Sequence, residues 1–140
     1  MSVLDKFKMV DILNTRTNAV LTFERNNILR FNCAAFMDLN YPSHIQVYID
    51  EKGKNLAIKA CKESDPNAIK FSRPQGEQVH PIKFMCIPVS RIVRKLMEWD
   101  EEEGWNAQGA LFLDEGTIIF SLEKASPIVR RGSSSQKKDE

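Results

Sequence analysis

The chain lacks the sequence features that mark most catalytic and metal-binding proteins. Its 140 residues contain three cysteines without a CxxC pair, two histidines, and six glycines that never cluster. These shortages disfavour a paired-cysteine zinc site and a phosphate-binding glycine loop. The motifs GxSxG and HExxH are also missing. We therefore expect a protein that is not an enzyme and that holds neither a metal ion nor another cofactor.

Membrane and secretion signals are missing as well. No apolar run approaches the roughly 18 residues of a membrane span, and the N-terminus lacks the apolar stretch of a signal peptide. Cys33, Cys61 and Cys86 are widely spaced and odd in number. We expect a cytoplasmic protein with buried, reduced thiols and no membrane contact. A zinc site that joins these cysteines to His44 or His80 is the weaker alternative, because zinc ligands usually come in close pairs.

Neither sign of charge is in large excess, since the chain has 20 basic and 19 acidic residues and a net charge of +1. The total does not require a polyanionic partner, so a basic surface must come from local segregation. Residues 71–100 carry five basic and three acidic groups, whereas residues 101–121 carry five acidic groups and no basic one. Patches of both signs are therefore expected.

Enough apolar material is present for one domain, because 42% of the residues are hydrophobic and 28% are charged. Residues 19–62 and residues 68–124 share one order of elements: strand, turn, strand, short helix, strand, turn, strand. One such unit is too small to bury a stable core alone. Two units can close a sheet around a shared core. A generic α+β domain without a true repeat is the alternative.

The first unit shows the pattern most clearly. "AVLTFE" and "ILRFN" are strand-like runs, and the intervening "RNN" predicts a turn because asparagine tolerates positive φ. "CAAFMDLNY" predicts a short helix that ends before Pro42. "HIQVYID" alternates apolar and polar residues, which indicates a half-buried strand.

The second unit has the same order with longer connections. "AIKFSR" and "IKFMCI" predict a strand pair joined by the loop "PQGEQVHP". A helix opened by Pro88 follows, and "AQGALFL" and "TIIFSLE" predict a hairpin with a tight turn at "DEG". Residues 1–18 form a lead-in, and residues 125–140 read as a disordered tail because bulky apolar residues are scarce.

The segments "ILRFNCAAFMDLNYPSHIQVYIDEKGKNLAIKACK" and "CIPVSRIVRKLMEW…ALFLDEGTIIFSLEK" resemble two tandem copies of the AbrB/SpoVT swapped-hairpin family, a layout found in the MraZ branch. The resemblance implies a mainly β protein with short helices, of the α+β type, in which two β-β-α-β-β repeats form one pseudo-symmetric swapped-hairpin barrel. It also implies DNA binding and oligomerisation. The first copy departs from the family pattern, with Asn32 in place of the helix-opening proline and with Phe36 and Met37 in place of helix arginines.

The helix at 91–99 carries the main candidate residues. At 100° per residue, Arg91, Arg94 and Lys95 share one arc with Glu98, and we expect the helix to end near Trp99 or Asp100. Arginine donates in a planar fork that suits phosphate. A solvated face with cations near a helix C-terminus is the simpler alternative. The apolar face, which we assign to the core, holds Ile92, Val93, Leu96, Met97 and Trp99.

These observations lead to two main functional hypotheses; a third, an enzyme, would need a pocket with converging polar groups that the sequence does not reveal. The first is a small DNA-binding transcription regulator, a monomer or homodimer, that contacts the phosphate backbone. Its DNA-binding residues would be Arg91, Arg94 and Lys95, with secondary contributions from Arg25, Arg30 and Arg73.

The second hypothesis is a protein-interaction module without DNA binding, similar to an antitoxin or a phage accessory protein. Its interface would use Trp99 and Trp105, which flank the acidic run Asp100–Glu103, because tryptophan is enriched at binding hot spots.

Overall fold

A computed structural model describes residues 18–128 and shows a mainly β protein with short helices. Residues 1–17 and 129–140, which hold most of the predicted lead-in and tail, lie outside the described residues. The strands are β1 Val20–Glu24, β2 Ile28–Phe31, β3 His44–Asp50, β4 Asn55–Cys61, β5 Ile69–Lys70, β6 Ile82–Met85, β7 Trp105–Phe112, β8 Thr117–Ser121 and β9 Ser126–Pro127. The helical elements are α2 Cys33–Asp38, α3 Ile87–Met97 and the 3-10 turn η1 Leu113–Glu115.

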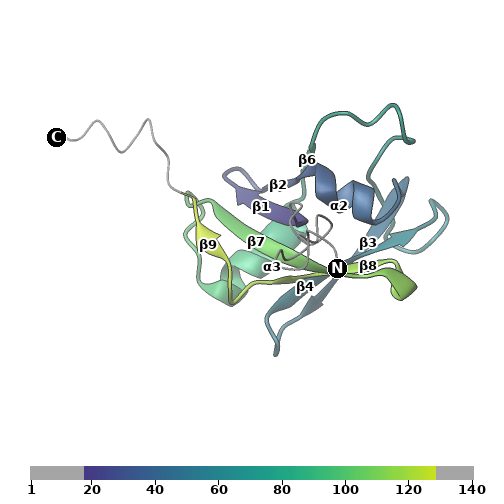
Figure 1. The fold of residues 1–140 in the computed structure, drawn as a ribbon. Coiled ribbons are helices and arrows are strands. Elements are labelled where there is room, and N and C mark those ends of the chain that lie inside the picture. The colour runs from purple at the N-terminus through teal and green to yellow at the C-terminus, as the bar shows by residue number, and fades with distance from the viewer. Residues whose placement is uncertain (1–17, 129–140) are drawn as a thin grey trace, which may run out of the picture.

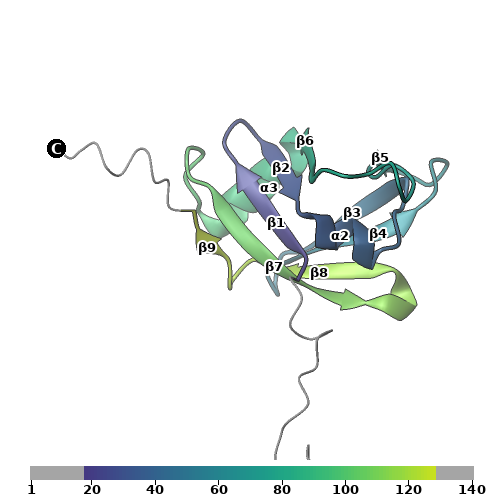
Figure 2. The same ribbon diagram turned by 45° about the horizontal axis from the view of Figure 1, so that its top comes forward.

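Eight strands form one curled antiparallel path in the order β5-β3-β4-β8-β7-β1-β2-β6, and β9 pairs with β7 beside it. The path bends into a half-barrel that remains open between β5 and β6 (Figures 1 and 2). α2 lies on the upper side in Figure 1 and α3 lies behind the sheet, with β4 and β8 below. Because most strands have two hydrogen-bonded neighbours, few backbone edges face solvent.

The predicted hairpins β1–β2, β3–β4 and β7–β8 are present as antiparallel pairs. The predicted β5–β6 hairpin, the first of the second unit, is wrong, because β5 pairs with β3 and β6 pairs with β2. The two strands are separated by residues 71–81, which include Pro74, Gly76 and Pro81. Proline has no backbone N–H to donate, so Pro74 and Pro81 cannot contribute ladder hydrogen bonds that would extend β5 and β6 toward each other as one hairpin.

The interior of the half-barrel is filled by alternate residues of the strands, as their period-two pattern requires. Phe31 is 1% exposed, and its ring centroid lies 5.1 Å from Phe71, 6.0 Å from Phe84 and 6.1 Å from Phe120. Such aromatic contacts across strands from both units tie the sheet around one shared core.

α3 packs one side against this core, with Val89 and Val93 buried. The helix opens at Ile87 and Pro88, as expected, but it ends at Met97 because Glu98 adopts a left-handed φ of 60°. The assignment of Ile92 to the core is wrong, since 46% of this residue is exposed. Ile92 instead lines an open groove toward the β3–β4 turn with Lys95 and Glu51.

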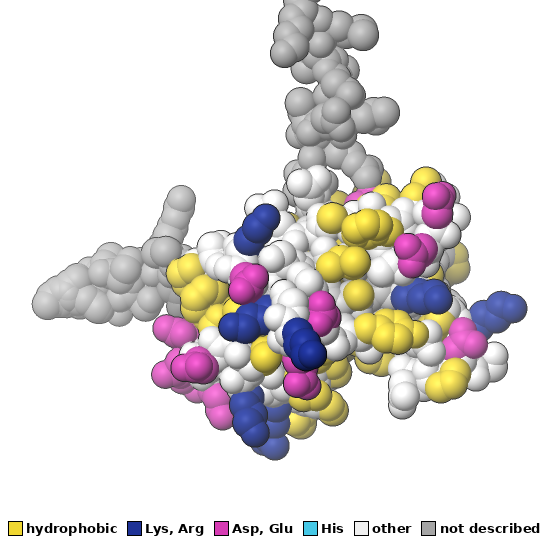
Figure 3. Space-filling view, turned by 90° about the horizontal axis from the view of Figure 1, so that it is seen from below, with side chains coloured by type: hydrophobic (Ala, Val, Ile, Leu, Met, Phe, Trp, Pro, Cys, Tyr) yellow, Lys and Arg dark blue, Asp and Glu magenta, His cyan; other side chains and the backbone are white. Residues whose placement is uncertain are grey.

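The C-terminal boundary also differs from the predicted tail. Ser126 and Pro127 form β9 against Asn106 and Trp105 of β7, so two residues that we placed in the tail belong to the sheet. The view from below, the side on which β4 and β8 lie, shows hydrophobic side chains in several groups with basic and acidic side chains scattered between them (Figure 3).

Candidate nucleic-acid interface

The turn between β1 and β2 is the part of the fold around which most predicted basic residues lie. Asn26 and Asn27 have φ values of 65° and 61°, the left-handed conformation that asparagine tolerates better than most residues. The predicted turn is therefore confirmed. The backbone N–H of Cys86 donates to the carbonyl of Asn27 at 2.8 Å, which holds the turn against the start of α3.

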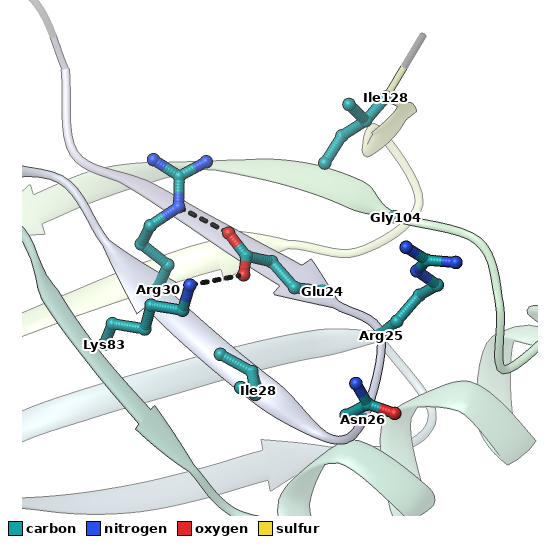
Figure 4. Close-up of a pocket in the computed structure, with 8 residues that line it drawn as sticks. All are labelled: Glu24, Arg25, Asn26, Ile28, Arg30, Lys83, Gly104 and Ile128. Atoms are coloured by element: carbon teal, nitrogen blue, oxygen red, sulfur yellow. Dashed lines mark hydrogen bonds and ion pairs between the residues drawn. The ribbon is translucent and has the colours of Figure 1, made fainter. Parts of the chain in front are cut away.

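The first groove at this turn is an open cavity of about 390 Å³ on the outer side of β1, β2 and β6 (Figure 4). Arg30 and Lys83 are direct partners in the β2–β6 register, and both point to one carboxylate. Arg30 Nε lies 2.7 Å from Glu24 Oε2, and Lys83 Nζ lies 3.4 Å from Glu24 Oε1. Glu24 reduces the repulsion between like charges placed opposite each other, and Arg25 at the rim leaves the groove with three cations around one anion.

Arg25 is exposed at the tip and contacts the acidic loop after α3. Its Nη1 lies 3.5 Å from Glu102 Oε1, with 46% and 75% of the two side chains exposed. An ion pair between such exposed groups contributes little to stability and is screened by salt. Arg25 therefore remains available to an anionic ligand that competes with Glu102.

The second groove, of about 300 Å³, lies on the α3 side of the same turn. Asn27 belongs to its wall, together with the exposed Arg91 and Lys95 of α3. Glu101 adds one acidic side chain to this wall. Both grooves thus meet at the turn, with basic residues from β2, β6 and α3 around it.

Arg94 does not share the outward arc that we predicted, because it is only 5% exposed. Its Nη1 donates to the carbonyl oxygens of Asp100 at 2.5 Å and Glu103 at 2.8 Å, and its Nη2 donates to the carbonyl of Glu24 at 3.0 Å. Burial lowers the pKa of Arg94, whereas the nearby carboxylates, with Glu101 first, oppose this shift. Its guanidinium is a structural clamp that joins the acidic loop to hairpin β1–β2.

The two tryptophans pack together instead of forming an exposed interface. Trp99 is 9% exposed and stacks on Trp105, with ring centroids 4.7 Å apart and an interplanar angle of 2°. Trp99 also meets Phe23 edge to face at 5.3 Å. The predicted surface role is wrong for Trp99, which belongs to the core as its helix position also indicated. Trp105 is half-buried, and its Nε1 has no hydrogen-bond partner in the described part of the chain.

Arg73 is exposed in the connection between β5 and β6, and it lines neither groove. Sequence reasoning missed Glu24 as the acceptor that organises the first groove. The alternation of strand residues could have identified it. Glu24 follows the buried Phe23 in β1, so its side chain must point outward, on the face where Arg30 lies.

The three cysteines of the chain form no disulfide bond among residues 18–128. Cys33, Cys61 and Cys86 are unpaired and half-buried, so they are more exposed than the predicted buried thiols. Burial and the neighbouring carboxylate of Asp65 raise the pKa of Cys61. Within residues 18–128, no group of three or more histidine, cysteine or carboxylate side chains is placed to hold a metal ion.

Comparison with models of known protein families, with curated proteins and with solved structures found no match to the chain. Among the described residues, no helix has the length and apolar character needed to cross a membrane.

Proposed function

We propose that this chain is a small DNA-binding regulator that contacts duplex DNA through the β1–β2 turn and the two grooves that meet there. One observation carries the proposal: Arg30 and Lys83 in the first groove, and Arg91 and Lys95 in the second, surround a narrow turn. Lysine and arginine that neutralise phosphates supply most of the sequence-independent affinity for DNA.

The shape of the turn suits a double helix better than a single strand. A two-stranded β ribbon fits the major groove of B-DNA, which is about 12 Å wide, while flanking cations can reach phosphates on either side. The exposed amide of Asn26 at the tip offers a donor and an acceptor to base edges. Trp99 is buried in its stack with Trp105, so it provides no platform for the bases of a single strand.

The strand pairing supports the two-repeat arrangement that the sequence suggests. Let the repeats be 19–62 and 68–124, so that β1 to β4 correspond to β5 to β8. The pairs β1–β7 and β3–β5 are then equivalent, and β2–β6 and β4–β8 each join corresponding strands. A pseudo-twofold relation requires these pairings. We propose a swapped-hairpin barrel that is open only where the β5–β6 pair is missing.

The direct test is fluorescence anisotropy with duplex DNA at low salt. We expect binding that weakens steeply with salt, and a loss of about 1 in the slope of log K against log salt for each phosphate contact removed. The double variants Arg30→Gln with Lys83→Gln and Arg91→Gln with Lys95→Gln should each weaken binding to all duplexes.

A matched control removes two other exposed lysines, Lys62 and Lys70, which line neither groove. Lys62→Gln with Lys70→Gln changes the net charge by the same amount and should leave affinity nearly unchanged. No binding to any duplex at low salt, or equal losses in the control and in both groove variants, would refute a DNA interface at this turn.

A protein-interaction module remains the second candidate, favoured by the charges inside the site. Glu24 and Glu102 pair with the two arginines of hairpin β1–β2. On the face seen from below, acidic and basic side chains are likewise interspersed among hydrophobic groups (Figure 3). Such a mosaic suits a partner with charges of both signs. A stoichiometric protein partner purified from the source cells, retained after nuclease treatment and lost in the two groove variants, would support this candidate over DNA.

A further inference from the structure

The outer face of the sheet carries an apolar row that crosses four neighbouring strands. Tyr48 of β3 pairs with Ala57 of β4, Ala57 with Ile119 of β8, and Ile119 with Ala110 of β7. Directly paired residues in an antiparallel sheet point to the same face. Their inward neighbours, such as Ile58 and Ile118, are fully buried, so the row lies on the opposite, outward face.

An apolar row is unusual on an outward sheet face, because antiparallel strands normally place hydrophobic residues toward the core and polar residues toward solvent. Tyr48 is 51% exposed, and Phe112, two residues after Ala110 on β7, is 46% exposed. A shallow cavity of about 180 Å³ opens in the row between Tyr48 and Ile119. The face belongs neither to the grooves at the β1–β2 turn nor to the shared core.

Few charged residues lie on this face, and the acidic and the basic one are on opposite sides of the apolar row. At the outward positions of β3, β4, β7 and β8, Asp50 and Lys59 are the charged residues. Asp50 pairs with Asn55 on one side of the row, whereas Lys59 pairs with Gln46 on the other side. The carboxylate of Asp50 on β3 therefore lies on one side of the apolar row, and the ammonium group of Lys59 on the adjacent strand β4 lies on the opposite side.

We propose that a second copy of this chain packs on this face and forms a twofold dimer. An axis along the row places Tyr48 and Ile119 against the same residues of the partner, as an isologous contact requires. The same rotation exchanges the two sides of the row, so Lys59 of each copy comes beside the partner subunit's Asp50. Two sheets packed face to face lie about 10 Å apart, a gap that lysine and aspartate side chains can span together.

The self-complementary placement of Asp50 and Lys59 favours a second copy over an unrelated partner. Asp50 is also held in position, because its Oδ1 accepts a hydrogen bond from the backbone N–H of Gly53 at 3.0 Å. The row has one residue from each of four strands, which is few compared with the roughly 20–30 residues that each partner contributes to a standard interface. The dimer is therefore of modest affinity and forms as concentration rises.

Sedimentation velocity of the full chain over a range of concentrations, up to about 200 µM, tests the proposal. We expect a monomer–dimer equilibrium that Tyr48→Glu abolishes. Asp50→Lys and Lys59→Asp should each raise the dimer Kd by about tenfold or more, because they place like charges together. The double variant that carries both changes should restore most of the wild-type affinity.

The charge swap separates an interface effect from a folding effect. Lys62→Asp, a charge reversal outside the row, is the matched control and should leave the dimer Kd unchanged. Far-ultraviolet circular dichroism verifies that each variant is folded, and Tyr48→Ser replaces Tyr48→Glu if the latter is not. A chain that stays monomeric throughout overturns the proposal, as does a dimer that is insensitive to Tyr48 substitution or that the double variant fails to restore.

Discussion

Arg94 shows at the scale of a single residue how a surface pattern can be misleading. Its position on α3 places it between Arg91 and Lys95, and a helical wheel assigns all three to one polar arc. The guanidinium nevertheless turns inward and donates to three backbone carbonyls, those of Glu24, Asp100 and Glu103. Arginine has five N–H donors and a long stem, so it can leave the helix surface to satisfy carbonyls of a nearby loop.

Replacing Arg94 with methionine should destabilise the protein by about 2–4 kcal/mol, because the carbonyls of Glu24, Asp100 and Glu103 lose a charged donor that is itself buried. Urea unfolding followed by tryptophan fluorescence measures the change. Arg91→Met, one helical turn away and exposed, is the matched control and should change stability by no more than about 0.5 kcal/mol. Equal stabilities for the two variants would contradict the clamp.

The tryptophans illustrate the same limit. A tryptophan beside four acids resembles an interface residue in sequence, but Trp99 stacks on Trp105 and closes the core above Phe23. Spacing along the chain cannot reveal that stack, because the two rings meet across the acidic loop, whose backbone is held by hydrogen bonds from Arg94. By contrast, Asn26 and Asn27 identify their turn directly through their tolerance of positive φ.

At the scale of elements, β7 is the strand that joins the two parts of the sheet. Its first half pairs with β1 and β9, and its second half pairs with β8. Gly109 lies at the change of partners, where a Cβ atom would come within 2.6 Å of Ile118 and 2.8 Å of Phe120. The glycine therefore allows the close approach that the bend requires.

Gly109→Ala should destabilise the protein by about 1–3 kcal/mol, because Ile118 and Phe120 are fully buried and have little room to move. Thermal unfolding monitored by circular dichroism gives the change in Tm. Gln108→Ala, at the adjacent exposed position of the same strand, should have a much smaller effect. An unchanged Tm for Gly109→Ala would show that the sheet relaxes more freely than this packing implies.

The β5–β6 connection is the element that sequence periodicity misassigned. Both segments have strand-like composition, and the repeat pattern places them in one hairpin. Their actual partners, β3 and β2, lie far away in sequence. Ser72 contributes to this pairing from outside the strand, since its backbone N–H and its hydroxyl both donate to the carbonyl of Pro42. Strand composition predicts a strand, but it does not predict the partner.

At the scale of the whole molecule, the half-barrel distributes stability unevenly. β4, β8, β7 and β1 occupy the middle of the path, whereas β5 and β6 form its ends and β9 pairs along one side only. Amides of central strands are covered on both sides, and opening them requires most of the sheet to unfold.

Hydrogen–deuterium exchange should therefore be slowest in β4, β8 and β1 and fastest in β5 and β9. Mass spectrometry of peptic fragments at neutral pH measures the order. The hairpin partners β3 and β4 are an internal control, since they share a register over seven residue pairs but differ in position along the path. Protection of β5 equal to that of β4 would indicate a closed barrel in solution.

The sequence by itself determined the mainly β character, three of the four predicted hairpins, the two short helices and the turn at Asn26 and Asn27. These features follow from local preferences: side-chain alternation, turn residues and the effect of proline on the backbone. The tertiary structure alone decided which strands pair across the two units, which basic residues reach solvent and where Glu24 and Arg94 find their partners. Those outcomes depend on contacts between distant segments, because only the curled sheet brings the acidic loop, α3 and hairpin β1–β2 together.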